Sequence, residues 1–85
     1  MTIIDEADHL DGLTEIFQDI FQDDGLIITR SMIHDDLPQW DSMNHLNILM
    51  ALEMRYRIKF SLVEIEAAQS VSDILQMIQR KLGSA

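Results

Sequence analysis

Residues 39–60 read QWDSMNHLNILMALEMRYRIKF. From Asp41 or Ser42 to about Arg57, apolar and helix-favouring residues follow one another almost without interruption, which predicts a helix. One apolar stripe of this helix comprises Ile48, Leu49, Leu52 and Tyr56, and a second comprises Met43, Met50 and Met54, with Asn47 between them. One stripe is sufficient for packing, so the second needs another explanation.

An amphipathic helix is predicted before this stretch, because apolar residues recur there at spacings of three and four. They are Leu10, Leu13, Ile16, Phe17, Ile20 and Phe21. The start of this helix is poorly marked, since Asp5 and Asp8 are both suitable N-caps. We expect it to end at residues 23–25, which read Asp-Asp-Gly.

Residues 25–40, GLIITRSMIHDDLPQW, show no sustained helical period and contain the only proline, so they are predicted to form a long ordered loop. A connection of this length without secondary structure is uncommon in a compact domain and is usually functional. We expect the loop to be held on the core by Leu26, Ile28, Met32, Ile33 and Leu37.

The C-terminal part predicts a short helix and a long one. LVEIEAA, residues 62–68, provides one or two helical turns. The last helix begins at Ser70, with Asp73 three residues on as a pair resembling a capping box. Its buried stripe is Val71, Ile74, Leu75, Ile78 and Leu82. The chain therefore predicts an all-α protein, a four-helix bundle with three longer helices and one short helix, as a single domain over residues 1–85.

The charge of the chain is strongly acidic and unevenly distributed. The formal net charge is −9, from 15 acidic and 6 basic residues, and residues 1–53 contain 12 acids and a single base, Arg30. Such a field repels nucleic acid and anionic membrane surfaces, which bind proteins through lysine and arginine. It either attracts basic patches on protein partners or serves solubility alone, and the charge by itself does not separate these two roles.

Several kinds of site are excluded by composition. The chain has no cysteine, so it has no disulfide, thiolate metal site or cysteine nucleophile. His9, His34 and His45 share no ligand spacing, and we expect no metal. No apolar run approaches the roughly 20 residues of a membrane span, and MTIIDEADHL lacks the basic region of a signal peptide. We expect a cytoplasmic monomer without membrane attachment.

Ser42 has two possible roles at the head of the central helix. A serine at a helix start is usually a cap, but Asp41 is an equally good cap and would leave the Ser42 hydroxyl available. The helix N-terminus would stabilise a phosphate ester there by about 0.3–1 kcal/mol, so another enzyme would have to install it. A serine hydrolase is the weakest interpretation, because a bundle this small offers little room for a substrate pocket.

These residues resemble the acyl carrier protein family over about residues 6–82. The family's signature is Asp-Ser-Leu at the start of its second helix, continuing into an apolar stretch with an Ala-Leu-Glu-like segment. Residues 41–43 match it with methionine in place of the usual leucine, and Ala-Leu-Glu at residues 51–53 falls in register. Helix order and loop length extend the similarity to SVSDILQMI, residues 70–78.

The resemblance implies a serine, here Ser42, esterified with 4′-phosphopantetheine that a phosphopantetheinyl transferase takes from coenzyme A. Asp41 corresponds to the acid beside that serine. The terminal thiol of the arm would carry an acyl group as a thioester between acyl-loading and acyl-transferring enzymes of a fatty-acid, polyketide or other specialised pathway. The chain itself would catalyse nothing, and an imported thiol agrees with the absence of cysteine.

The resemblance also provides a use for the second stripe, because the exposed side of the second helix docks partner enzymes in the family. That side maps onto Met43, Asn44, Asn47, Met50, Glu53 and Met54. Flexible methionine suits a surface that meets several partners. Alternatively, some of these methionines pack internally against the long loop. Carriers of bulk fatty acid synthesis are strongly acidic along this helix, so the substitution of asparagine and methionine here favours a stand-alone carrier of a specialised pathway.

Two alternatives stay open. One is an aminoacyl carrier of the D-alanyl or peptidyl type, although Trp40 disfavours the peptidyl branch, in which small glycines commonly precede the serine. The other is an unmodified acidic helical module that binds a partner through its methionines, with Ser42 as a cap only. The identity of the cargo does not follow from these residues.

Overall fold

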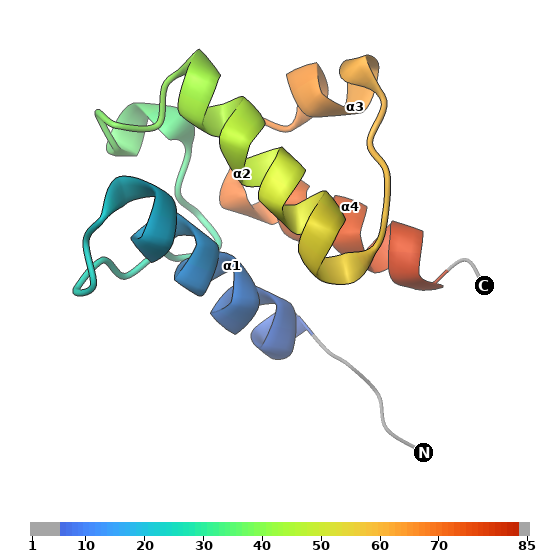
Figure 1. Cartoon of the computed structure of the whole chain (residues 1–85), viewed down its shortest axis with the longest axis horizontal. Helices are drawn as coiled ribbons and strands as arrows, with labels where there is room; N and C mark the ends of the chain where they lie inside the picture. Colours follow the sequence, from blue (N-terminus) through green and yellow to red (C-terminus); the bar gives the residue numbers. More distant parts are fainter. Residues whose placement is uncertain (1–5, 84–85) are drawn as a thin grey trace.

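The computed structural model describes residues 6–83, which form four α-helices and one short 3-10 helix (Figure 1). The elements are α1 (Glu6–Phe21), η1 (His34–Asp36), α2 (Ser42–Tyr56), α3 (Leu62–Ala67) and α4 (Val71–Gly83). Within that range the backbone forms no strand, only an isolated antiparallel bridge between Ile33 and Ser70. The predicted all-α bundle of three longer helices and one short helix is confirmed.

The core lies between the three longer helices, with α1 packed on both α2 and α4. Its fully buried side chains come from the predicted stripes of these helices, because an amphipathic helix buries its apolar face. They are Leu13, Phe17, Ile48, Leu49, Leu52, Val71, Ile74, Leu75 and Ile78. Leu82, which was predicted to belong to the α4 stripe, remains 37% exposed, since it lies in the last turn of α4 at the edge of the bundle.

The two ends of α1 differ from the sequence prediction. Asp8 lies inside the helix and is not its N-cap, and Asp5, the other predicted cap, lies outside the described residues. At the other end, α1 stops at Phe21, before the predicted Asp-Asp-Gly signal, because Gln22 adopts a left-handed conformation with φ of 53°. This conformation turns the chain out of the helix.

Gly12 on α1 leaves room for the ends of two side chains from α2. A Cβ atom at this position would lie 2.5 Å from the hydroxyl oxygen of Tyr56 and 3.2 Å from Nε of Arg55. Any larger residue would therefore displace the Tyr56 hydroxyl group. Glycine lowers helix propensity by about 1 kcal/mol relative to alanine, and this contact explains why it is nevertheless found inside α1.

The long connection between α1 and α2 is ordered because it caps α4. The backbone N–H groups of Val71 and Ser72 donate to the carbonyl oxygens of Met32 and Arg30, at 2.9 and 3.1 Å. The first N–H groups of a helix have no partner inside the helix, so the loop satisfies two groups that α4 cannot. The loop thereby acquires a fixed path across the bundle.

The hydrophobic contacts of this loop agree with the prediction at four positions of five. Ile28 is buried, and three further side chains pack partly buried against the core, namely Leu26, Met32 and Leu37. The prediction is wrong for Ile33, which is 42% exposed. The loop also contains the single turn η1, which has no period in the sequence because it is only three residues long.

Helix α3 lies at the periphery and contains no buried residue. A capping box begins it: the hydroxyl oxygen of Ser61 accepts from the N–H of Glu64, and the Glu64 carboxylate accepts from the N–H of Ser61 at 2.7 Å. The same carboxylate pairs with Nζ of Lys81 on α4, at 2.9 Å. Polar contacts therefore fix α3 where hydrophobic burial does not.

The start of α4 follows the predicted pairing only in part. The hydroxyl oxygen of Ser70 accepts from the N–H of Asp73, as expected, at 3.0 Å. The Asp73 carboxylate, however, accepts from the N–H of Gln69 and not from that of Ser70. The Ser70 N–H therefore takes no part in a reciprocal capping box.

The attachment of α3 is predicted to weaken in acid through Glu64. The hydrogen bond from the Ser61 N–H, followed by that from Lys81, lowers the pKa of Glu64 below its ordinary 4.5. A carboxylate whose pKa is lowered by folding contributes stability above its unfolded pKa, and this contribution is lost as the pH falls through the folded pKa. An NMR titration of the Glu64 carboxyl carbon should give a midpoint below 4.5, and Lys81→Met should raise it only partly, since the Ser61 contact remains. A wild-type midpoint at or above 4.5 would contradict this assignment.

Candidate functional site

The site begins at the junction between the long loop and α2. Asp41 is the N-cap of α2, and its Oδ1 accepts from the backbone N–H of Asn44 at 2.9 Å. Ser42 is the first residue of the helix and is exposed. Because Asp41 satisfies the N–H group that a capping hydroxyl would bind, Ser42 is not the cap of α2.

The chain segment before Ser42 is held rigidly by Trp40. This side chain is only 3% exposed, and its ring meets the ring of Phe17 on α1 edge to face, with centroids 5.1 Å apart. The backbone N–H of Trp40 donates to the carbonyl of Leu37, and the side-chain amide of Asn44 donates to the carbonyl of Gln39. Ser42 therefore projects from a corner that is fixed on both sides.

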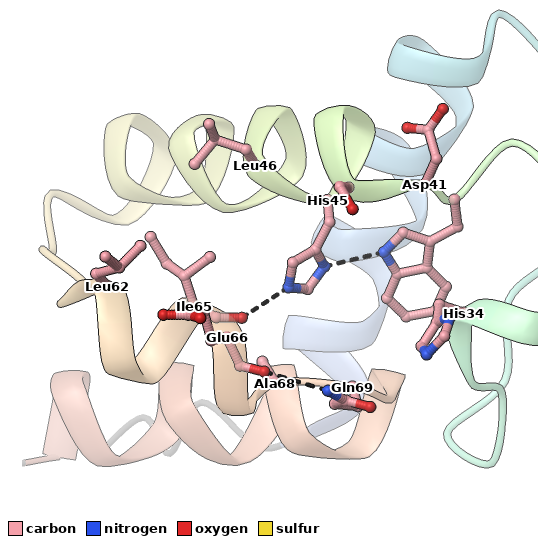
Figure 2. Close-up of a pocket in the computed structure, with 11 residues that line it drawn as sticks. His34, Asp41, His45, Leu46, Leu62, Ile65, Glu66, Ala68 and Gln69 are labelled. Carbon is pink, nitrogen blue, oxygen red and sulfur yellow. Dashed lines mark hydrogen bonds between the residues drawn. The ribbon is translucent and has the colours of Figure 1, made fainter.

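A groove of about 600 Å³ opens beside this corner, between the first turns of α2 and the short α3 (Figure 2). Its apolar walls come from Trp40, Leu46, Leu62, Ile65 and Ala68. Its polar groups come from His34, Asp41, Ser42, His45, Glu66 and Gln69. Thus Ser42 and Asp41, singled out from the sequence, lie together on the rim of one groove.

His45 lies in the middle of this groove, as Figure 2 shows. From the sequence, His45 was a candidate only for binding a metal. It lies one helical turn after Ser42, and its ring bonds to Trp40 and to the backbone of α3. No signal in the sequence indicated the contact with α3, because it depends on where this distant helix packs.

The methionine side chains of α2 point outward. Met43, Met50 and Met54 are 74%, 52% and 83% exposed. The alternative in which they pack against the long loop is therefore wrong. Asn47 is exposed beside them, and spacings of three and four place these residues on one side of the helix.

Two other residues of the expected partner side have roles inside the protein. The Glu53 carboxylate accepts from the backbone N–H of Phe60 at 2.8 Å and so holds the connection between α2 and α3. Asn44 is half-buried and fixes the loop through Gln39. The sequence placed these two residues with the methionines, but their polar groups are already engaged.

The described part of the chain has neither a cluster of metal-binding side chains nor a membrane-spanning helix. Among residues 6–83, no three histidine, aspartate or glutamate side chains lie where they could hold a metal ion. None of the helices described there is long and apolar enough to cross a membrane.

The fold is similar to that of a holo acyl carrier protein from Geobacter metallireducens, whose structure was solved in solution by NMR. The TM-score is 0.79 and the sequence identity 39%, over 87% of this chain and 85% of that one. No model of a known protein family matches the chain, and a search of curated proteins finds no match.

Identity at this level over most of both chains shows more than a shared architecture: the molecule is a small helical carrier domain. The chain belongs to the acyl carrier protein family. The family resemblance found in the sequence is thereby confirmed.

Proposed function

We propose that this protein carries acyl groups on a 4′-phosphopantetheine arm attached to the hydroxyl of Ser42. The main support is the arrangement at the start of α2. Asp41 caps the helix, so the Ser42 hydroxyl stays exposed on the rim of the groove. The similar Geobacter protein was solved in its holo form, which supports the same kind of modification here.

The residues at this corner fit a phosphodiester. Ser42 would supply the ester oxygen at the N-terminus of a 15-residue helix, where the helix dipole stabilises a negative charge by about 0.3–1 kcal/mol. Asp41 keeps the first turn of α2 formed, and Trp40 fixes the direction from which the chain enters it. When bound, the arm supplies a thiol that holds an acyl group as a thioester.

The surroundings of Ser42 provide no catalytic base, which agrees with a carrier that catalyses no reaction itself. A serine nucleophile needs an adjacent base, usually histidine. The nearest histidine along α2 is His45, but both of its ring nitrogens are bonded elsewhere, to Trp40 and to the carbonyl of Ile65. It is therefore not available as a base for Ser42.

The absence of cysteine makes the proposal directly testable by thiol titration. The unmodified chain has no thiol, so it should react with no equivalent of a thiol reagent. After incubation with coenzyme A, Mg²⁺ and a broad-specificity phosphopantetheinyl transferase, and removal of coenzyme A, it should show one thiol per chain. That thiol should then accept an acyl group from an acyl-loading enzyme. If no thiol appears under conditions in which a control carrier is modified, the alternative of an unmodified interaction module is favoured.

We further propose that the transferase and the acyl-transferring enzymes dock on the methionine face, defined as Met43, Asn47, Met50 and Met54. Three exposed methionines on one helix form an apolar surface that the core does not use. Since acids are scarce along this face, docking should depend on apolar contact more than on charge pairing. This composition favours a carrier of a dedicated cytoplasmic pathway over a carrier of bulk fatty acid synthesis. Loading assays with acyl and aminoacyl substrates would distinguish an acyl cargo from the alternative, an aminoacyl cargo.

The substitution Met54→Glu is expected to raise the KM of the modifying transferase about tenfold, equivalent to about 1.4 kcal/mol, because it places a charge on the apolar face. The far-UV circular dichroism should be unchanged, since Met54 is 83% exposed. Steady-state kinetics at low and high salt measure the effect, with Gln79→Glu on α4 as the matched control. A steep loss of wild-type activity with salt, combined with no effect of Met54→Glu, would show that net charge rather than the methionine face guides docking.

A further inference from the structure

His45 connects three segments that meet at the groove. The indole N–H of Trp40 donates to Nδ1 of His45 at 3.0 Å, and Nε2 of His45 lies 2.8 Å from the carbonyl oxygen of Ile65 on α3 (Figure 2). One half-buried ring thus joins the end of the long loop, the second turn of α2 and the middle of α3.

These two contacts fix the protonation state of the ring. An indole N–H can only donate, so Nδ1 of His45 must be an unprotonated acceptor. A carbonyl oxygen can only accept, so Nε2 must carry the proton. The arrangement therefore requires neutral histidine in the Nε2–H tautomer. A second proton on Nδ1 would face the Trp40 N–H, and the two donors would repel each other.

The bond to Ile65 satisfies a group that α3 leaves open. The carbonyl of Ile65 is among the last four of this helix, which have no partner within it. The N–H four residues on, that of Gln69, donates instead to the carboxylate of Asp73. His45 consequently replaces the missing intrahelical donor and at the same time attaches α3 to α2.

Few other contacts hold α3 in place. None of its residues is buried, and Leu62 and Val63 are 69% and 76% exposed. Within α3 itself, the other anchors are the partly buried Ile65 and the contact between Glu64 and Lys81. The connections on either side of α3 are held by the buried Phe60 and Ala68. An element with so little burial is expected to open locally at low cost, so a single bond to Ile65 has a large influence on its position.

We propose that His45 is a latch that sets the width of the groove beside Ser42. The neutral ring, oriented by the Trp40 N–H, holds α3 against α2. A proton on Nδ1 leaves Nε2–H a donor but turns the ring away from the Trp40 N–H, which withdraws Nε2–H from the Ile65 carbonyl and releases α3. His45 is a positioning residue in this account, because it acts through α3. The latch itself does not depend on modification of Ser42. Its use, to decide when a group tethered to Ser42 can enter the groove, rests on the proposed function.

The titratable groups around the groove come from each segment that neighbours the ring. The loop contributes His34, whose ring meets that of Trp40 edge to face and whose Nδ1 pairs with Asp35 at 3.2 Å. Asp41 at the head of α2 and Glu66 on α3 complete the set along the groove. His34 contacts the same indole ring as His45, so it must be controlled for in any pH experiment.

The first test is NMR of the unmodified protein with ¹⁵N-labelled histidine. At about pH 8, where histidine is ordinarily neutral, His45 should show the Nε2–H tautomer. Between about pH 8 and pH 5, the indole N–H signal of Trp40 should shift together with the His45 ring. Hydrogen exchange at Ile65 and Ala68, whose N–H groups bond to Ser61 and Glu64, should accelerate at least tenfold after correction for intrinsic rates. The Nδ1–H tautomer, or exchange that does not respond to pH, would overturn the proposal.

Variants separate the latch from a general effect of pH. His45→Ala should show the fast exchange of α3 already at about pH 8, and His45→Gln, which does not titrate, should remove the pH response. His34→Gln is the matched control in the same groove and should keep both the tautomer and the response. Equal α3 exchange in wild type and His45→Ala, or an unchanged pH response in that variant, would contradict the latch. If His45→Ala fails to fold, the tautomer and the pH response of the wild-type protein still test the latch.

All of these measurements use unmodified protein. The latch can therefore be contradicted while thiol titration supports the modification of Ser42, and the modification can be contradicted while the latch is supported.

Discussion

Replacing Ser42 with alanine is expected to abolish modification completely and to leave the fold intact. Only the hydroxyl oxygen of residue 42 is lost, and no other group on the groove rim can form the same ester. The cap of α2 survives, because Asp41 and not Ser42 accepts from the N–H of Asn44. We therefore expect a loss of stability of about 0.5 kcal/mol or less.

Thiol titration and circular dichroism of Ser42→Ala measure both parts of this prediction. Ser31→Ala is the matched control, since Ser31 is an exposed serine in the long loop and should leave modification unchanged. A variant that still acquired a thiol would remove Ser42 from its proposed role. A variant that unfolded would show that Ser42 is a structural residue after all.

The largest loss of stability is expected for Phe17→Ala. Phe17 is fully buried, and its ring contacts those of Phe21 and Trp40, with centroids 5.5 and 5.1 Å away. Truncating a buried phenylalanine costs about 3–5 kcal/mol, through lost burial and the cavity left behind. Folded domains are stable by about 0.05–0.15 kcal/mol per residue, so this chain has only about 4–13 kcal/mol in total.

Urea denaturation followed by circular dichroism tests this expectation. With a slope of about 1–3 kcal/mol per molar urea, the midpoint of Phe17→Ala should fall by at least about 1 M. Ile27→Ala is the control, because Ile27 is 75% exposed and its truncation should change stability by no more than about 0.5 kcal/mol. A loss below about 1 kcal/mol for Phe17→Ala would show that the packing of Phe17 against Phe21 and Trp40 contributes little to stability.

The elements of this fold could be predicted where a local pattern determines them. Helical periodicity identified the buried stripes of α1, α2 and α4, because each stripe is a property of one helix. The equivalence of Asp41 and Ser42 as caps was also visible, and the structure resolves it in favour of Asp41. Helical periodicity also predicted that the second stripe of α2, Met43, Met50 and Met54, is exposed, since a helix of this bundle needs only one buried face.

What the sequence did not reveal depends on contacts between distant segments. The exposure of Ile33 follows from the path of the loop over the start of α4. The need for Gly12 arises from Tyr56, at the far end of another helix. The roles of Glu53 and His45 require α3 and its connection to be in place, so neither is encoded in a local pattern.

The most direct test of the account is to locate the modification within the chain. Fragmentation mass spectrometry of the protein, after treatment with coenzyme A and a phosphopantetheinyl transferase, should place a single phosphopantetheinyl group on Ser42. The chain has five other serines, Ser31, Ser61, Ser70, Ser72 and Ser84, and each should remain unmodified. The group found on one of these, or a chain that stays unmodified while a control carrier is modified, would contradict the account.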